Sequence, residues 1–174
     1  MCPKGHQCQR KQLRDQPSNW IGALHPEPCM PGTYAAADGT EKCSNCPAGQ
    51  FCPLAGQSET FKCPAGHYCP EGSIKPEACK ETTYNPDEER ADEISCIPCP
   101  AGQYCNSKGL AKPTDLCPNG YNCFEVGIDN PFQDKYKCAK GATCYSTVDD
   151  GSKTEPCKPG TFNPREYGNS DDDC

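Results

Sequence analysis

The stretch CSNCPAGQFCPLAGQSETFKCPAGHYCPEG, residues 43–72, contains nearly the same seven residues twice. CPAGQFC (46–52) is followed after ten residues by CPAGHYC (63–69), with cysteine, proline, glycine and an aromatic residue at matching places. This spacing has two readings. Either the thiols hold a metal ion, or they are paired in disulfides and the repeat is an architectural unit.

The composition favours paired thiols. The 174 residues include 18 cysteines, 19 prolines and 16 glycines, and only 34% of residues are hydrophobic even with cysteine counted. About a tenth of residues being cysteine is typical of a disulfide scaffold, which persists in oxidising compartments. The sequence therefore predicts a small disulfide-rich fold: an elongated array of cysteine-rich repeats with short β-hairpins and turns, little helix and no large hydrophobic core. The predicted location is extracellular or at the cell surface.

Charge and hydropathy exclude several classes of partner. The net charge is −7 and the basic residues are scattered, so nucleic acid is not an expected partner. No apolar run is long enough to span a bilayer, and we expect no membrane span in this sequence. No Asn-x-Ser/Thr sequon is present, so N-linked sugar is not expected, whereas O-linked sugar stays open. Because the sequence starts within a repeat, we expect it to be an internal piece of a longer protein.

Six segments have the form C-x5-C, with two cysteines separated by five residues. All six carry glycine at the fourth place, and five carry proline directly after the first cysteine, Ala139 being the exception. Proline fixes φ and glycine supplies a positive φ, so each segment is predicted to be a tight turn. An aromatic residue precedes the second cysteine in three of them, where its ring would cover the disulfide. The segments are Cys2–Cys8, Cys46–Cys52, Cys63–Cys69, Cys99–Cys105, Cys117–Cys123 and Cys138–Cys144.

Three longer segments alternate with these turns and share an aromatic residue at their sixth place. We interpret each as an extended strand, a turn and a short return strand. Pro-Gly precedes the aromatic region in the first and third segments, and Glu81-Thr82 replaces it in the second. The segments are Cys29–Cys43, Cys79–Cys96 and Cys157–Cys174.

The alternation predicts a nested repeat, in which each long segment is followed by a series of short turns. Residues 1–28 would be the end of a preceding repeat and a cysteine-poor stretch. Residues 29–78 would form the first unit and 79–156 the second, with an extra C-x5-C turn at 138–144. Residues 157–174 would begin a further unit.

The pattern CxPGTYxxxxGxxxCxxCPAGxYC, clearest in residues 29–52, resembles the ephrin-receptor-like cysteine-rich repeat, which is similar to the cysteine-rich domains of tumour-necrosis-factor receptors. Such repeats are found in receptor ectodomains and, in long arrays, in large surface or secreted proteins of protists. The resemblance implies that each long segment closes on itself, as Cys29–Cys43, Cys79–Cys96 and Cys157–Cys174.

Two pairing schemes are open for the remaining twelve cysteines. In the local scheme every C-x5-C segment closes on itself. In the crossed scheme adjacent turns are linked, as Cys46–Cys63 with Cys52–Cys69, and as Cys99–Cys117 with Cys105–Cys123. We favour crossed links because they would brace neighbouring turns, although Cys2, Cys8, Cys138 and Cys144 must then pair locally or with other partners.

Metal binding and catalysis are weakly supported. The CxxC pairs at 43–46 and 96–99 do not face a second pair at zinc-finger spacing, and His6, His25 and His67 follow no ligand-like interval. No phosphate loop or nucleophile elbow is present. We therefore predict no metal, no cofactor and no enzymatic activity.

Two functions from different classes fit these features. The first is structural: a rigid array of disulfide-stapled units serving as shaft, coat or extracellular filament, with self-association of subunits. The second is a receptor or adhesion ectodomain that binds a protein ligand. We favour the structural function, because no loop concentrates aromatic and arginine side chains.

Two groups of apolar residues are candidate contact surfaces. Trp20, Ile21 and Leu24 lie in the stretch poorest in cysteine, where they form either a binding patch or, the reading we favour, a local hydrophobic plug. Three further aromatics, expected to be exposed, lie in the fourteen-residue gap before Cys138 and are candidates for lateral or axial contacts between molecules. They are Phe124, Phe132 and Tyr136.

Overall fold

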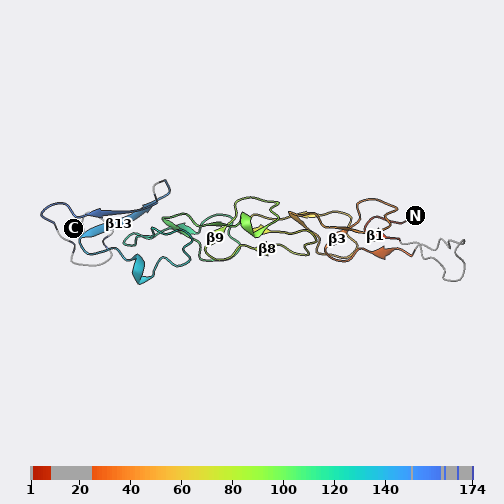
Figure 1. The fold of residues 1–174 in the computed structure, drawn as a ribbon, viewed down its shortest axis with the longest axis horizontal. Helices are drawn as coiled ribbons and strands as arrows, with labels where there is room; N and C mark the ends of the chain where they lie inside the picture. Colours follow the sequence, from red (N-terminus) through yellow and green to blue (C-terminus); the bar gives the residue numbers. More distant parts are fainter. Residues whose placement is uncertain (1, 9–24, 150, 162, 164–167, 169–173) are drawn as a thin grey trace, which may run out of the picture. The chain divides into compact units, whose positions relative to one another are not determined.

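Short antiparallel hairpins make up nearly all of the regular structure (Figure 1). The computed structural model describes residues 2–8, 25–149, 151–161, 163, 168 and 174. The first twelve strands have two residues each: β1 (His6–Gln7), β2 (Glu27–Pro28), β3 (Thr33–Tyr34), β4 (Ser44–Asn45), β5 (Gln50–Phe51), β6 (Phe61–Lys62), β7 (His67–Tyr68), β8 (Glu77–Ala78), β9 (Thr83–Tyr84), β10 (Ile97–Pro98), β11 (Gln103–Tyr104) and β12 (Asp115–Leu116).

The remaining elements lie mostly in the second half of the chain. The longest hairpin joins β13 (Ala142–Thr147) to β14 (Gly151–Pro156), and each of its strands has six residues. The helical elements of the described residues are two single 3₁₀ turns, η1 (Glu93–Ser95) and η2 (Asp134–Tyr136). In the part of the chain that the structure describes, no helix has the length and apolarity needed to cross a membrane.

The chain divides into two compact units. Unit 1 consists of Met1–Pro64, Tyr68–Glu77 and Glu88–Glu93. Unit 2 consists of Ala65–His67, Ala78–Asp87 and Ile94–Cys174. The division into these two units does not test the repeat boundaries expected from the sequence. The boundaries at 29, 79 and 157 therefore remain a prediction.

One seven-residue turn recurs throughout both units. Its fourth residue has a positive φ, for example 80° at Gly49 and 81° at Gly102. The amide of the fifth residue donates to the carbonyl oxygen of the second, as Gln50 does to Pro47 at 3.0 Å. A four-residue turn with a positive φ at its third position is characteristic of type II geometry, which favours glycine there. The glycine at the fourth place of each C-x5-C segment is thereby explained.

The three long segments begin with this same turn. From the sequence we had expected them to differ from the C-x5-C turns along their whole length. In them Ala35, Asn85 or Asn163 occupies the place of the second cysteine, and each is at most 3% exposed. The Asn85 side chain donates to the carbonyl oxygen of His67 at 2.9 Å, a position in the preceding turn. A threonine at the fifth place also bonds back within the turn, as Thr83 Oγ1 does to the Lys80 carbonyl at 2.8 Å.

Each turn is joined to the next by a reciprocal pair of backbone hydrogen bonds. The amide of its fourth residue donates to the carbonyl oxygen of the seventh residue of the following turn, over 2.7–3.0 Å. Its fourth carbonyl accepts from the first amide of that following turn, as Gly49 does from Cys63. The first type of bond joins Gly5 to Ala35, Gly32 to Cys52 and Gly49 to Cys69 in unit 1, and Gly66 to Asn85, Thr82 to Cys105, Gly102 to Cys123, Gly120 to Cys144 and Gly141 to Asn163 in unit 2.

In the first six turns, from the one beginning at Cys2 to the one beginning at Cys99, a second pair of bonds ties the turn to the loop that leaves the next turn. The loop amide donates to the first carbonyl of the earlier turn, as Gly56 does to Cys29 at 2.8 Å. The seventh amide of the earlier turn then donates to the next loop carbonyl, as Ala35 does to Gln57 at 3.0 Å. We name the four bonds together the turn ladder. Within each unit it satisfies backbone groups that a sheet or helix would otherwise pair.

The disulfides are local, and the crossed links favoured from the sequence are wrong. All eighteen cysteines lie in the described part of the chain and form nine bonds, with Cα–Cα distances of 5.4–6.0 Å. Every C-x5-C turn closes on itself, and the three long segments also close on themselves. The physical reason is that the turn ladder already holds neighbouring turns together. The sulfur atoms therefore close single turns instead of bridging them.

The buried residues confirm a fold without a large core. Most buried hydrophobic side chains among the described residues are half-cystines; the others are Ala35, Ile128, Pro131, Tyr136 and Ala142. Closing a seven-residue loop stabilises the folded chain by about 2 kcal/mol in the chain-entropy model. The structure is accordingly a small disulfide-rich fold that is nearly free of helix, as predicted.

At several turns the glycine at the fourth place is also required by close backbone packing. A Cβ atom at Gly49 would lie 2.3 Å from the carbonyl oxygen of Glu89, and one at Gly66 would lie 2.1 Å from that of Gly109. These distances are far below van der Waals contact. At these two turns the fourth residue therefore touches a loop two turns further along the chain.

The local pairing predicts a specific peptide map. Trypsin cuts the oxidised, denatured chain after Lys42 and Lys62 and so separates residues 43–62 from the fragment that begins at Cys63. Mass spectrometry should find residues 43–62 linked only to the fragment that carries Cys29. A disulfide between residues 43–62 and the fragment starting at Cys63 would instead show crossed pairing.

Two glycine substitutions distinguish the cost of a steric clash from the cost of backbone strain. Gly39→Ala should cost about 1 kcal/mol, because φ is 79° there but nothing lies within 4 Å of the added Cβ. Gly49→Ala should cost about 3 kcal/mol, because the same backbone strain is joined by a clash. Hydrogen exchange of the Cys63 amide, which donates to Gly49, reports the difference. Equal acceleration by both substitutions would contradict the close packing.

Candidate contact surface and aromatic pocket

The segment of residues 124–137 is an irregular connection that is longer than the loops 53–62, 70–78 and 106–116. It connects the turn that ends at Cys123 to the turn that begins at Cys138, and it contains η2. Phe124 and Phe132 are 61% and 59% exposed, as expected from the sequence. Tyr136 is only 3% exposed, so the prediction of an exposed Tyr136 is wrong.

Tyr136 is buried because it forms the centre of a small hydrophobic cluster in unit 2. Its ring packs with Ile128 and the Cys117–Cys123 disulfide, and the side chains of Tyr104 and Tyr121 pack against the same cluster. In this cluster an aromatic ring covers a disulfide and takes the place of a larger core.

Polar contacts fix the outer edge of this ring. The Tyr136 hydroxyl donates to Oε2 of Glu125 at 2.5 Å, and Lys135 Nζ lies 2.9 Å from the same oxygen. Lys135 Nζ also lies 4.4 Å from the centre of the Tyr136 ring, within the range of a cation–π contact. The hydrogen bond from Tyr136, followed by that from Lys135, holds the pKa of Glu125 below its ordinary value.

The buried ring also positions the exposed aromatic side chains. Phe124 meets Tyr136 edge to face, with ring centres 6.2 Å apart, and Phe132 meets Tyr121 in the same way at 5.5 Å. Edge-to-face pairs are the geometry that aromatic quadrupoles favour. Phe124 and Phe132 are therefore held in defined orientations although most of their surface is in contact with solvent.

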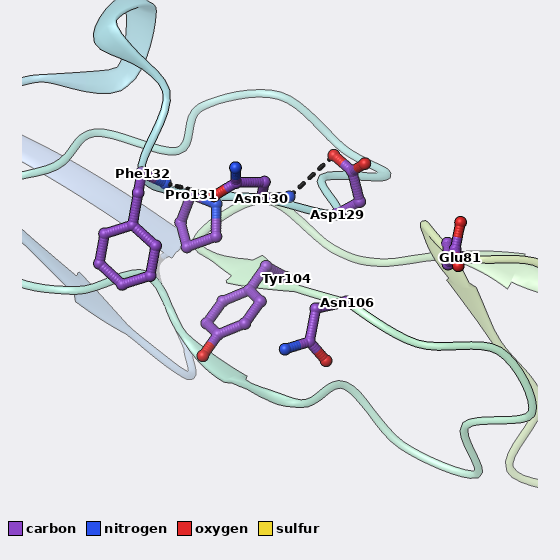
Figure 2. A pocket seen from close by; sticks show the side chains of 7 residues that line it. All are labelled: Glu81, Tyr104, Asn106, Asp129, Asn130, Pro131 and Phe132. Carbon is purple, nitrogen blue, oxygen red and sulfur yellow. Dashed lines mark hydrogen bonds between the residues drawn. The ribbon is translucent and has the colours of Figure 1, made fainter.

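A pocket of about 320 Å³ opens beside Phe132 (Figure 2). Phe132 and Tyr104 present their rings on one side of it, and Glu81 lies at the opposite side, with Asp129 and Asn106 between them (Figure 2). Its seven lining residues, all in unit 2, are Glu81, Tyr104, Asn106, Asp129, Asn130, Pro131 and Phe132.

Local hydrogen bonds shape the loop on one side of the pocket. The Asp129 carboxylate accepts from the Asn130 amide at 2.8 Å, and the Asn130 side-chain oxygen accepts from the Phe132 amide at 3.0 Å (Figure 2). Pro131, between them, is fully buried. These contacts fix the backbone from which Asp129 and Phe132 project.

The other residues singled out from the sequence have varied positions. Trp20, Ile21 and Leu24 lie outside the described residues. The Nδ1 atoms of His6 and His67 each contact a carbonyl oxygen of their own turn, at 3.0 and 3.1 Å. Among the described residues no group of three or more His, Cys, Asp or Glu side chains is arranged to hold a metal ion.

Sequence reasoning missed the pocket. Its residues come from three separated stretches, around Glu81, around Tyr104, and from Asp129 to Phe132. One signal was available, because Glu81-Thr82 interrupts the Pro-Gly of the repeat. The sequence alone does not show that this interruption lies beside residues 129–132, because the packing of successive turns brings the two stretches together.

Comparison with known proteins gives no assignment. No protein-family model matches the chain, and no curated protein matches it. The structure itself defines a disulfide-rich array of small repeated hairpin units with regular cysteine spacing.

The Glu125 contacts predict a pH-dependent loop. A lowered pKa in the folded state means that the carboxylate stabilises the fold above its ordinary pKa, and that this contribution is lost as pH falls through the folded pKa. Tyr136→Phe should raise the pKa of Glu125 towards its ordinary value, measured by NMR titration of the carboxyl carbon. Tyr145→Phe, which removes a similar bond to Glu155, should leave the Glu125 titration unchanged. An unaltered Glu125 titration in Tyr136→Phe would contradict this account.

Proposed function

We propose that this chain is a structural segment of an extended, disulfide-stapled element outside the cytosol, such as a shaft, coat or surface fibre. The turn ladder is the observation that carries the proposal. The reciprocal pair of backbone bonds recurs from one turn to the next within each unit, and the first six turns also have the second pair. No turn depends on a distant core, so further turns can be added without altering those present.

The chemistry of each turn suits a load-bearing element. Every turn or long segment is closed by its own disulfide, so its loop cannot open without breaking a covalent bond. The six C-x5-C disulfides enclose only five residues each, which limits the length of chain that tension could release. Short covalent loops joined by backbone bonds resist extension without a hydrophobic core.

Two further observations support a location outside the cytosol. Nine disulfides with no free thiol indicate an oxidising environment. The resemblance of residues 29–52 to ephrin-receptor-like repeats, which are found in surface and secreted proteins, favours the same location. Neither observation depends on the fibre proposal.

Solution scattering tests the extended form. A compact globule of this length would have a radius of gyration of about 16 Å. The oxidised protein should give a value well above this, together with the scattering of a thin rod of constant cross-section. A radius near that of a globule would refute an extended element.

Labelling of native material tests the role. Antibodies raised against the oxidised chain should mark extracellular fibres or coats along their length when unreduced samples are imaged by electron microscopy. Label on isolated molecules at the cell surface, with no continuous assembly, would replace the structural function with that of a receptor or adhesion ectodomain.

A further inference from the structure

Two departures from the repeat meet at the aromatic pocket. The first is Glu81, the one acidic residue at the third place of any of the nine turns. The second is the segment of residues 124–137, which supplies Asp129 and Phe132. Two separate exceptions to the repeat therefore line one pocket.

The first exception carries a conformational cost. Thr82 follows Glu81 and has φ of 78°, where the other eight turns have glycine. A residue with a Cβ costs about 1–2 kcal/mol in this conformation. The packing tolerates it because the approach is looser here: a Cβ at Gly127 would lie 3.8 Å from that of Thr82. The ladder is kept at this turn, since Thr82 still donates to Cys105.

We propose that the pocket binds an arginine side chain presented by a partner protein. The aromatic rings of Tyr104 and Phe132 form an apolar wall, and the carboxylates of Glu81 and Asp129 give the pocket negative charge. No lysine or arginine is among the seven residues that line it. The inference goes beyond the structural function and does not depend on it.

The shape of arginine matches this lining. Its planar guanidinium stacks on aromatic rings and donates several hydrogen bonds in its own plane, whereas the lysine ammonium is a compact, strongly hydrated charge. The guanidinium plane would lie against Phe132 or Tyr104 while its N–H groups donate to Asp129 or Glu81. The side-chain oxygen of Asn106 is a further acceptor at the rim. A neutral ligand would leave the two carboxylates without a matching charge.

The probe for this site is the capped tripeptide acetyl-Gly-Arg-Gly-amide, added to the full oxidised chain. Amide NMR shifts should change saturably at Tyr104, Asn106, Asp129 and Phe132, and the response should weaken with added salt. The same tripeptide with citrulline, which has the shape of arginine without its charge, should bind at least about threefold more weakly.

Variants with matched controls locate the site. Glu81→Gln should weaken binding about threefold, because an exposed ion pair is lost. Phe132→Ala should also weaken it about threefold, because the stacking surface is lost. Glu59→Gln and Phe61→Ala remove an exposed carboxylate and a half-exposed ring in unit 1 and should leave binding unchanged. Glu81→Gln removes only a charge, so it remains informative if Phe132→Ala perturbs the loop.

Three results would overturn the proposal. The first is an equal response to the arginine and citrulline tripeptides. The second is the absence of saturable shifts at the pocket with the arginine tripeptide. The third is saturation by methyl glucoside in place of the arginine tripeptide, which would assign the pocket to carbohydrate.

Discussion

The structure depends on one constraint: the fourth residue of each turn must adopt a positive φ, which directs its backbone groups to the following turn. In that conformation its amide and its carbonyl oxygen both bond to the following turn, as Gly49 does with Cys69 and Cys63. At Gly49 and Gly66 a Cβ would also strike a carbonyl oxygen two turns away, whereas Gly141 and Gly160 have nothing within 4 Å. Glycine is thus favoured by conformation at every such place and by space at some of them.

The disulfides complement this ladder and do not replace it. Each closes a short loop and so limits the conformations of that turn in the unfolded chain. Stability is therefore assembled from many equivalent local contacts. This explains how a chain with so few buried hydrophobic residues maintains a defined fold within each unit.

The sequence predicted the fold class, because cysteine content and the Cys-Pro-x-Gly spacing report directly on turns and disulfides. The resemblance gave the right pairing for the three long segments, whereas the crossed links favoured for the C-x5-C turns were wrong. Local and crossed links differ only in which cysteines approach each other, and the sequence does not show this. It also did not reveal that Ala35 and Asn85 occupy cysteine positions in the same turn. Only the hydrogen bonds show that equivalence.

The candidate surface was predicted in part. Phe124 and Phe132 are exposed, whereas Tyr136 is needed to cover the Cys117–Cys123 disulfide. A linear pattern cannot tell which of several aromatics in one loop will be buried. The sequence also does not show that Glu81 and Phe132 line the same pocket, because the packing of successive turns brings them together.

The most direct test of the turn ladder is the NMR scalar coupling transmitted through its hydrogen bonds. The account predicts a coupling between the Gly49 amide nitrogen and the Cys69 carbonyl carbon, and equivalent couplings from Gly32 to Cys52 and from Gly102 to Cys123. Absence of these couplings, with the glycine amides exchanging freely with solvent, would contradict it.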